Sequence, residues 1–382
     1  MAIKIGLEGY DVQYTLSPET TTDNISIKND SGDLIKITTM LELANDFENK
    51  PFEIHFLAKS NLKENDIFQV YSRVTKARIG WLIPVISLDS NLHDKADDIH
   101  FQRYAYMAIR NAISAFNHEE CFSPTIDSVS EEIPFSSLFH ESTALLILSQ
   151  ETFTQGFSFN IDRAMPSLVK HGYVKLSKAN PDNLTLCGIA PEENRIYLEN
   201  ISKHIDSTRL ISQLLSSTFA YESTPAFKFF FLYQIIELLM EEVYKHQQQE
   251  IVTQLVDSYG DLGKTKELLE KISASTSEKK RMELLICQYS KISDDTANLK
   301  KVCNNLLIEL NREKEEHFQG FLYKIRNFIF HQYRDFPEDK VDMLNEVSNE
   351  LLYILPKLLE TYAPPEKALP ELPETNVPTE GA

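Results

Sequence analysis

The chain has 382 residues, of which 42 % are hydrophobic and 25 % are charged, values typical of globular proteins, and its length predicts two domains. Its 57 acidic and 38 basic side chains give a formal net charge of −19, which argues against a protein that coats nucleic acid through a general positive field. Basic residues do cluster locally in the second half, for example at Lys279, Lys280 and Arg281, so a local anion site is compatible with the charge.

Several classes of protein lack their usual signatures here. The four cysteines show no paired spacing, and the chain contains no glycine-rich phosphate loop, so we expect no metal and no cofactor. The first residues are not those of a signal peptide, and the most apolar run, residues 227–240, is interrupted by Lys228 and Glu237. The sequence therefore predicts a cytoplasmic protein with no membrane partner.

The first hundred residues alternate apolar and polar side chains between turn-prone dipeptides, which predicts β-strands. The expected strands are residues 3–5, 12–14, 25–27, 34–37, 52–57, 68–74 and 79–86. Such closely spaced strands favour an antiparallel sheet, arranged as a sandwich or a partly open barrel. Residues 101–116 are expected to form a helix, residues 144–148 a buried strand, and residues 183–186 and 195–198 a hairpin.

The second half predicts helices almost throughout. They are expected at residues 226–247, 264–273, 277–292, 295–332 and 339–360. The fold class is therefore α+β and multidomain: a β-rich α+β domain over residues 1–205, an all-α bundle over 206–362, and a disordered tail rich in Pro and Glu over 363–382.

One stretch of this helical half combines a core face with chemically active side chains. Phe321, Leu322, Ile325, Phe328 and Ile329 recur at helical spacing and predict a face docked on a core. Arg326 and His331 lie about 140° apart around such a helix and about 7.5 Å apart along it. Tyr323 and Phe330 fall between them, away from the core stripe, and predict a partner surface.

Arg326 and Asn327, followed by three residues and His331, fit the Arg-x4-His pattern of the HEPN superfamily, which this region resembles. The resemblance implies a helical bundle that dimerises through the motif helix and, in many members, cleaves RNA without a metal. It also implies that an acidic residue of the first bundle helix, here Glu237, supports Arg326. The alternative is that Glu237 is a solvated residue on the helix face.

The motif residues suit RNA cleavage. His331 exchanges protons near neutral pH and could act as general base or acid. Arg326 presents a fork of donors to a phosphate whose charge increases in the transition state, and Asn327 could orient the imidazole. Lys324 could contact a phosphate, although an exposed solubilising role is the more common one for a single lysine.

We therefore expect a metal-independent endoribonuclease of the toxin or antiviral-defence kind that acts as a homodimer, with Tyr323 and Phe330 at the interface and RNA as the substrate. The β-rich domain would be the sensor or specificity element, and an inhibitor or trigger protein is a possible further partner. The rival reading is a non-catalytic HEPN-like module for dimerisation or binding, in which Arg326 forms a salt bridge and His331 caps its helix.

Overall fold

The computed structural model describes residues 2–7, 10–16, 25–39, 51–115, 125–126, 132–152, 159–176 and 181–365. The N-terminal part is rich in β-structure and the C-terminal part is helical, which confirms the coarse division expected from the sequence. Of the expected tail, residues 366–382 lie outside the described residues.

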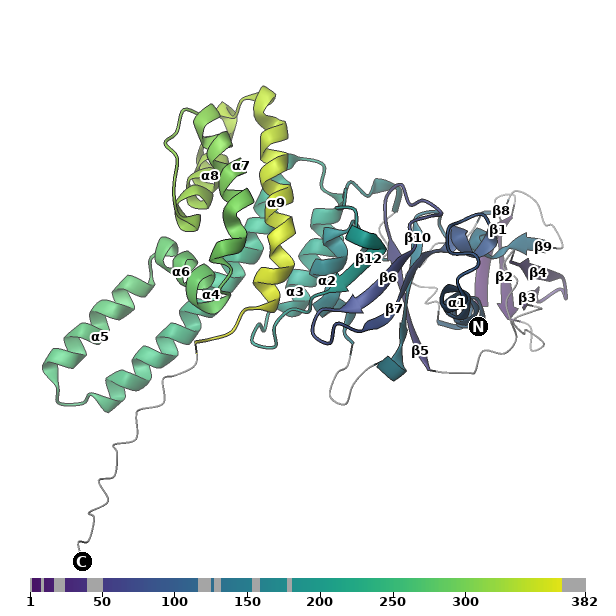
Figure 1. Cartoon of the computed structure of the whole chain (residues 1–382), viewed down its shortest axis with the longest axis horizontal. Coiled ribbons are helices and arrows are strands. Elements are labelled where there is room, and N and C mark those ends of the chain that lie inside the picture. Colours follow the sequence, from purple (N-terminus) through teal and green to yellow (C-terminus); the bar gives the residue numbers. More distant parts are fainter. Residues whose placement is uncertain are drawn as a thin grey trace, which may run out of the picture.

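Two six-stranded sheets form the N-terminal part (Figure 1). The first has the strand order β8-β1-β2-β3-β4-β9, with the bounds β8 Thr125–Ile126, β1 Ala2–Leu7, β2 Tyr10–Leu16, β3 Ile25–Asn29, β4 Leu34–Thr38 and β9 Glu132–Pro134. The second has the order β11-β5-β10-β7-β6-β12, with the bounds β11 Val174–Lys175, β5 Phe52–Ala58, β10 Thr143–Ser149, β7 Arg78–Pro84, β6 Phe68–Ser72 and β12 Arg195–Leu198.

The expected all-antiparallel arrangement is wrong in one respect, because each sheet is mixed. Strands β1 and β8, β4 and β9, and β6 and β12 pair in parallel, and all three pairs join segments far apart in sequence. The expected hairpin of residues 183–186 and 195–198 is also wrong. Pro181–Asn183 form a 3-10 turn, whereas β12 pairs with β6 in the register Ile196 to Val70.

Helix α1 (Ile99–Ala115) lies between the two sheets, so they do not pack face to face as a sandwich (Figure 1). The position of strand β10 explains why its residues 144–148 are all apolar. Leu145 and Ile147 face the cluster that contains α1, whereas Leu146 and Leu148 face the opposite cluster. A strand that is buried on both faces requires apolar side chains on both.

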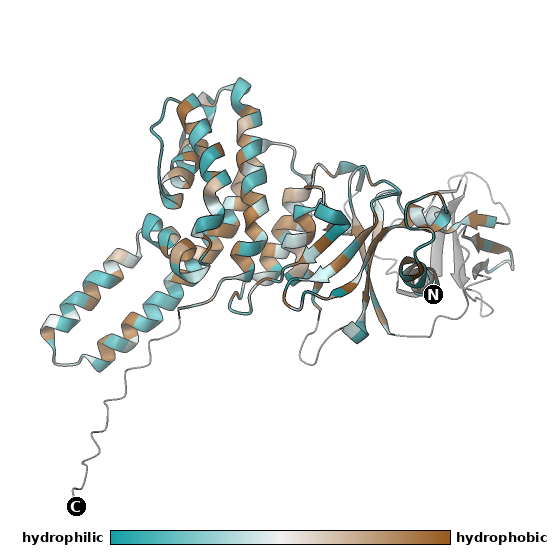
Figure 2. Cartoon of the chain, viewed as in Figure 1, coloured by the Kyte–Doolittle hydropathy of each residue, from teal (hydrophilic) through white to brown (hydrophobic). Residues whose placement is uncertain are grey.

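The helical part consists of α3 Thr208–Gln213, α4 Pro225–Asp257, α5 Leu262–Ser275, α6 Glu278–Leu284, α7 Ala297–Glu309, α8 Phe318–Gln332 and α9 Val341–Glu360. Pro225 occupies the first turn of α4, where its missing N–H has no intrahelical partner to lose. The end of α4 and all of α5 project from the bundle as an arm (Figure 1), along which hydrophilic and hydrophobic residues alternate (Figure 2).

The helix expected over residues 295–332 is two helices, α7 and α8, separated by residues 310–317. Asn311 adopts a positive φ of 55° just after α7, and Asn is one of the few non-glycine residues that tolerates this conformation. This break is important for the candidate site because the connecting segment contacts α8.

One hydrophobic core continues across residue 205. Its fully buried members include Leu146 of β10, Met165 of α2 (Ile161–Lys170), Ile236 of α4 and Leu355 of α9. The β-rich and helical parts therefore share buried surface. The architecture changes from β-rich to helical near residue 205, but the hydrophobic core is continuous there.

Candidate functional site

Helix α8 carries the motif and is fixed by its core face. Phe321, Leu322, Ile325 and Ile329 are buried, and Phe328 is partly buried, as the helical spacing predicts. The helix begins after His317, and Gly320 lies in its first turn. A Cβ on Gly320 would lie 2.7 Å from Glu315 Oε2, so glycine allows the preceding segment to approach the helix closely.

Arg326 faces α4 and makes the contact expected with Glu237. Its Nη2 lies 3.5 Å from Glu237 Oε1, and its Nη1 donates a hydrogen bond of 3.0 Å to Asn327 Oδ1. Gln234 Nε2 donates to the other carboxylate oxygen of Glu237 at 2.7 Å. The side chains of Arg326 and Glu237 are 21 % and 31 % exposed, so the pair lies at the edge of the core and is partly accessible to solvent.

Partial burial governs the ionisation of this cluster. Desolvation raises the pKa of Glu237, and the neighbouring Arg326 guanidinium opposes that rise by stabilising the carboxylate. Desolvation, together with a hydrogen bond to Glu278 of α6, also raises the pKa of Tyr233. The Tyr233 hydroxyl donates this bond to Glu278 Oε1 at 2.5 Å.

Phe330 corrects one expectation. Its half-buried ring packs on its own chain: it lies 5.2 Å from the ring of Phe230 and 6.3 Å from that of Tyr233, both on α4. The guanidinium carbon of Arg326 lies 4.8 Å from the Phe330 ring centroid and 5.7 Å from that of Tyr233. The helical wheel showed only one core stripe, but α8 also contacts α4 on this second flank, and Phe330 fills that contact.

His331 lies on the opposite flank and is exposed. Within the described part of the chain it makes no hydrogen bond or ion pair, and it lines a pocket of about 580 Å³. Asn327 lines the same pocket while accepting the bond from Arg326, whereas Arg326 itself is not among the lining residues. One chain therefore brings Asn327 close to both motif partners but leaves Arg326 and His331 on different sides of α8.

The segment between α7 and α8 forms the other side of this pocket. The buried side chain of Asn304 holds it through two bonds to Glu315, accepting from its N–H at 2.8 Å and donating to its carbonyl at 2.9 Å. Arg312 donates to Gln332 Oε1 at 2.7 Å and also lines the pocket. These bonds hold residues 310–317 against α8 and place the Arg312 guanidinium beside it.

Lys324 lines the pocket, but its charge already has a partner. Its Nζ lies 2.8 Å from Glu315 Oε1 and donates to the Glu313 carbonyl at 3.1 Å. It is half-buried, so it is not a simple exposed solubilising residue, and contact with a phosphate would compete with Glu315.

Two further cations line this pocket: Arg312, which the sequence did not single out, and Lys279, which it indicated only as part of a basic cluster. Arg312 and Lys279 form no ion pair within 4.0 Å among the described residues. Lys279 of α6 lies 5.0 Å from the ring centroid of Tyr323, which is half-buried and lines the pocket instead of standing free. Lys279 lies on α6 and Arg312 lies between α7 and α8, so no helical spacing relates either residue to His331 on α8.

The described residues offer neither a metal cluster nor a membrane span. They contain no group of three or more His, Cys, Asp or Glu arranged to hold a metal ion. No helix among them combines the length and the apolar character needed to cross a bilayer. Comparison of the chain with protein-family models, curated proteins and solved structures finds no match.

Proposed function

We propose that the protein is a metal-independent endoribonuclease of the toxin or antiviral-defence kind, built on a HEPN-like bundle over residues 206–362. The observation that carries the proposal is the pocket shared by Asn327 and His331, in which Arg312 and Lys279 have no ion-pair partner among the described residues. A pocket with excess positive charge attracts a polyanion locally, even on a protein whose net charge is −19.

In this proposal His331 removes the proton of the ribose 2′-hydroxyl or protonates the leaving 5′-oxygen. Its exposure supports either role, because a free imidazole can reach both oxygen atoms of a bound strand. Asn327 orients the imidazole or binds a phosphate oxygen. Arg326 stabilises the charge on the phosphorane-like transition state, and Glu237 and the Phe330 ring hold its guanidinium in place.

A homodimer would complete the site. Arg326 and His331 face different sides of α8, so a two-fold pairing of motif helices would place the Arg326 edge of one chain beside the His331 edge of the other. Tyr323 remains a candidate contact residue because it is half-buried at the pocket rim. Phe330 would support the interface indirectly, by fixing α8 on α4.

The rival function is a non-catalytic dimerisation or binding module. One observation favours it: Arg326 already has a carboxylate, an amide and two aromatic rings as partners, which together could explain the residue as structural. On that reading the pocket beside His331 would hold an acidic partner and no chemistry would follow.

Cleavage of total RNA by the purified protein in EDTA separates the two functions. We expect fragments with 2′,3′-cyclic phosphate and 5′-hydroxyl ends, because the 2′-oxygen is the nucleophile. His331→Ala should abolish them. His317→Ala, at the exposed start of the same helix, is the matched control and should cleave normally. Fragments that persist in His331→Ala, or that require a divalent metal, would overturn the proposal, and intact RNA with the wild type would favour the binding module.

A further inference from the structure

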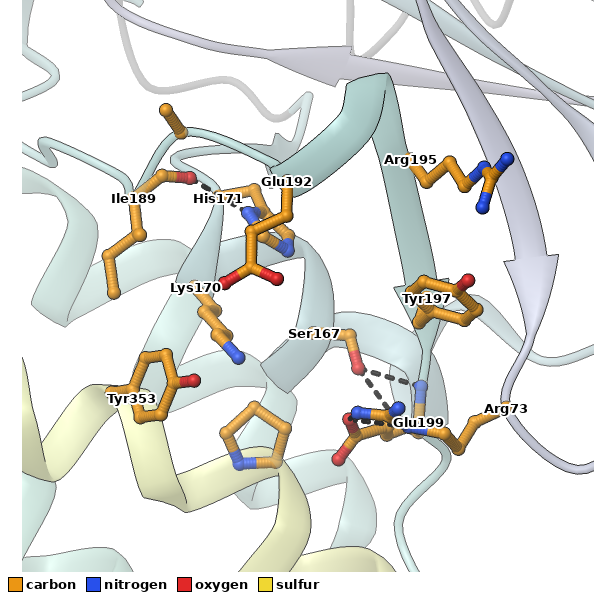
Figure 3. Close-up of a pocket in the computed structure, with 12 residues that line it drawn as sticks. Arg73, Ser167, Lys170, His171, Ile189, Glu192, Arg195, Tyr197, Glu199 and Tyr353 are labelled. Atoms are coloured by element: carbon orange, nitrogen blue, oxygen red, sulfur yellow. Dashed lines mark hydrogen bonds and ion pairs between the residues drawn. The ribbon is translucent and has the colours of Figure 1, made fainter.

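A second cavity, of about 170 Å³, lies where the β-rich part meets the last helix. Helix α2 contributes Ser167 and Lys170, and helix α9 contributes Tyr353 (Figure 3). Tyr197 of strand β12 and Glu199, the first residue after that strand, also line the cavity. None of these residues belongs to the Arg326 or His331 clusters. The cavity is therefore independent of the proposed nuclease site.

Most polar groups at the base of this cavity already have partners. Glu199 accepts two bonds from Arg73, from Nη2 at 2.6 Å and from Nε at 3.1 Å, so its charge is neutralised. The Ser167 hydroxyl accepts from the Glu199 N–H at 2.8 Å and donates to the Glu199 carbonyl at 3.1 Å. These three residues therefore form a preorganised floor whose bonds are made within the protein.

Lys170 is different. Within the described residues no carboxylate oxygen lies within 4.0 Å of its ammonium group, which sits 4.0 Å from the ring centroid of Tyr353. The side chain is half-buried, and burial lowers its pKa. The carboxylates of Glu199 and Glu192 stabilise this charge only at longer range, so an anion in direct contact would offset more of the cost of its partial desolvation. In Figure 3 the ammonium group points into the cavity.

The rim of the cavity offers acceptors. The ring Nδ1 of His171 donates to the Ile189 carbonyl at 2.8 Å, which leaves Nε2 with a lone pair when the imidazole is neutral. Burial lowers the pKa of His171 and favours that neutral form. Glu192 also lines the cavity and lies on the same side as Lys170 in Figure 3. Both groups would accept bonds from ligand hydroxyls, and Glu192 would repel a ligand with excess negative charge.

We propose that this cavity binds a small hydroxylated organic anion, whose phosphate or carboxylate lies against Lys170 and whose hydroxyls face His171 and Glu192. A cavity of about 170 Å³ suits a small molecule, such as a sugar phosphate or a sugar acid. Because α2, β12 and α9 all contribute, the ligand would connect the β-rich part to the bundle.

Isothermal titration calorimetry on the full chain tests the proposal with ribose 5-phosphate and gluconate as probes. If only ribose 5-phosphate binds saturably, the anionic group of the ligand is a phosphate. If only gluconate binds saturably, that group is a carboxylate. Lys170→Met should weaken binding about tenfold or more, because it removes a charge-assisted contact. Lys203→Met, an exposed lysine outside the cavity, is the matched control and should bind as the wild type does.

Glu192→Gln provides a test of opposite sign that does not depend on the stability of the Lys170 variant. The Gln side chain keeps an oxygen that accepts from the ligand hydroxyls but carries no negative charge, so the variant should bind either probe more tightly while leaving the floor of the cavity intact. The proposal is overturned if neither probe binds at millimolar concentration, if Lys170→Met binds as tightly as the wild type, or if Glu192→Gln weakens binding. RNA cleavage plays no part in these measurements, so the nuclease proposal stands or falls separately.

Discussion

Replacement of Arg326 by alanine should destabilise the protein even if it never binds RNA. At 3.5 Å the attraction between Arg326 and Glu237 is about 5 kcal/mol at an effective dielectric constant of about 20. Partial exposure and the cost of desolvation reduce this to a net of about 1–2 kcal/mol. Loss of the two cation–π contacts removes about 1 kcal/mol, and loss of the hydrogen bond to Asn327 removes about 1 kcal/mol more.

We therefore expect Arg326→Ala to lower the free energy of unfolding by about 3–4 kcal/mol in urea titrations near neutral pH. Adding Glu237→Gln to this variant should restore part of the loss, because the carboxylate left without its cation becomes neutral. Arg326→Lys is the matched control. It keeps the charge but not the fork of donors, so it should lose less stability than the alanine variant while still losing cleavage activity.

The pH dependence of the same variants tests the cause. The pKa of Glu237 is already raised in the folded protein, and loss of Arg326 should raise it further. A carboxyl group whose folded pKa exceeds its unfolded pKa destabilises the protein as pH rises from the unfolded value, about 4.3, through the folded one. The cost of Arg326→Ala should therefore be smaller at pH 4 than at pH 7. An equal cost at both values would refute the electrostatic part of the reasoning.

Three further variants test neighbouring features. His331→Gln should lose RNA cleavage with an unchanged melting temperature, because the side chain is exposed; a large drop in melting temperature would assign it a structural role instead. Phe330→Ala should lower the free energy of unfolding by about 2 kcal/mol, because its ring packs on α4; an unchanged stability with a loss of dimers by sedimentation would show it to be a surface residue after all. Asn304→Ala should cost about 1–2 kcal/mol and speed amide hydrogen exchange in residues 310–317, whereas unchanged exchange there would show that Asn304 does not hold the segment.

Hydrophobic spacing was sufficient to locate the helices that carry broad core faces. The stripe of α8 and the start of α4 at Pro225 follow from local sequence alone. The break between α7 and α8 was missed, although residues 311–316 are all polar or charged and contain no core position. Residues 312–316 are Arg, Glu, Lys, Glu and Glu, which favour a helix, so the composition gave no sign of the turn at Asn311.

Contacts between distant elements could not be found in this way. Local spacing predicts a hairpin for β12, because its true partner, β6, precedes it by more than a hundred residues and pairs in parallel. Helical spacing predicts an outward-facing Phe330, because the spacing within α8 does not show where α4 lies. The pairing of Arg326 with Glu237 was expected only through the HEPN resemblance, and the cations Lys279 and Arg312 carried no signal that linked them to His331.

The core that continues across residue 205 has a consequence for how the molecule melts. Leu146 and Leu355 belong to one buried cluster, so separating the two parts would expose apolar surface on both. Unfolding of either part then removes support from the other, and calorimetry should show one heat-absorption peak in place of two. The calorimetric enthalpy should match the van't Hoff enthalpy of that peak. A bundle expressed from residue 206 alone should be prone to aggregation, because the faces of α3 and α9 that α2 covers would be open to water.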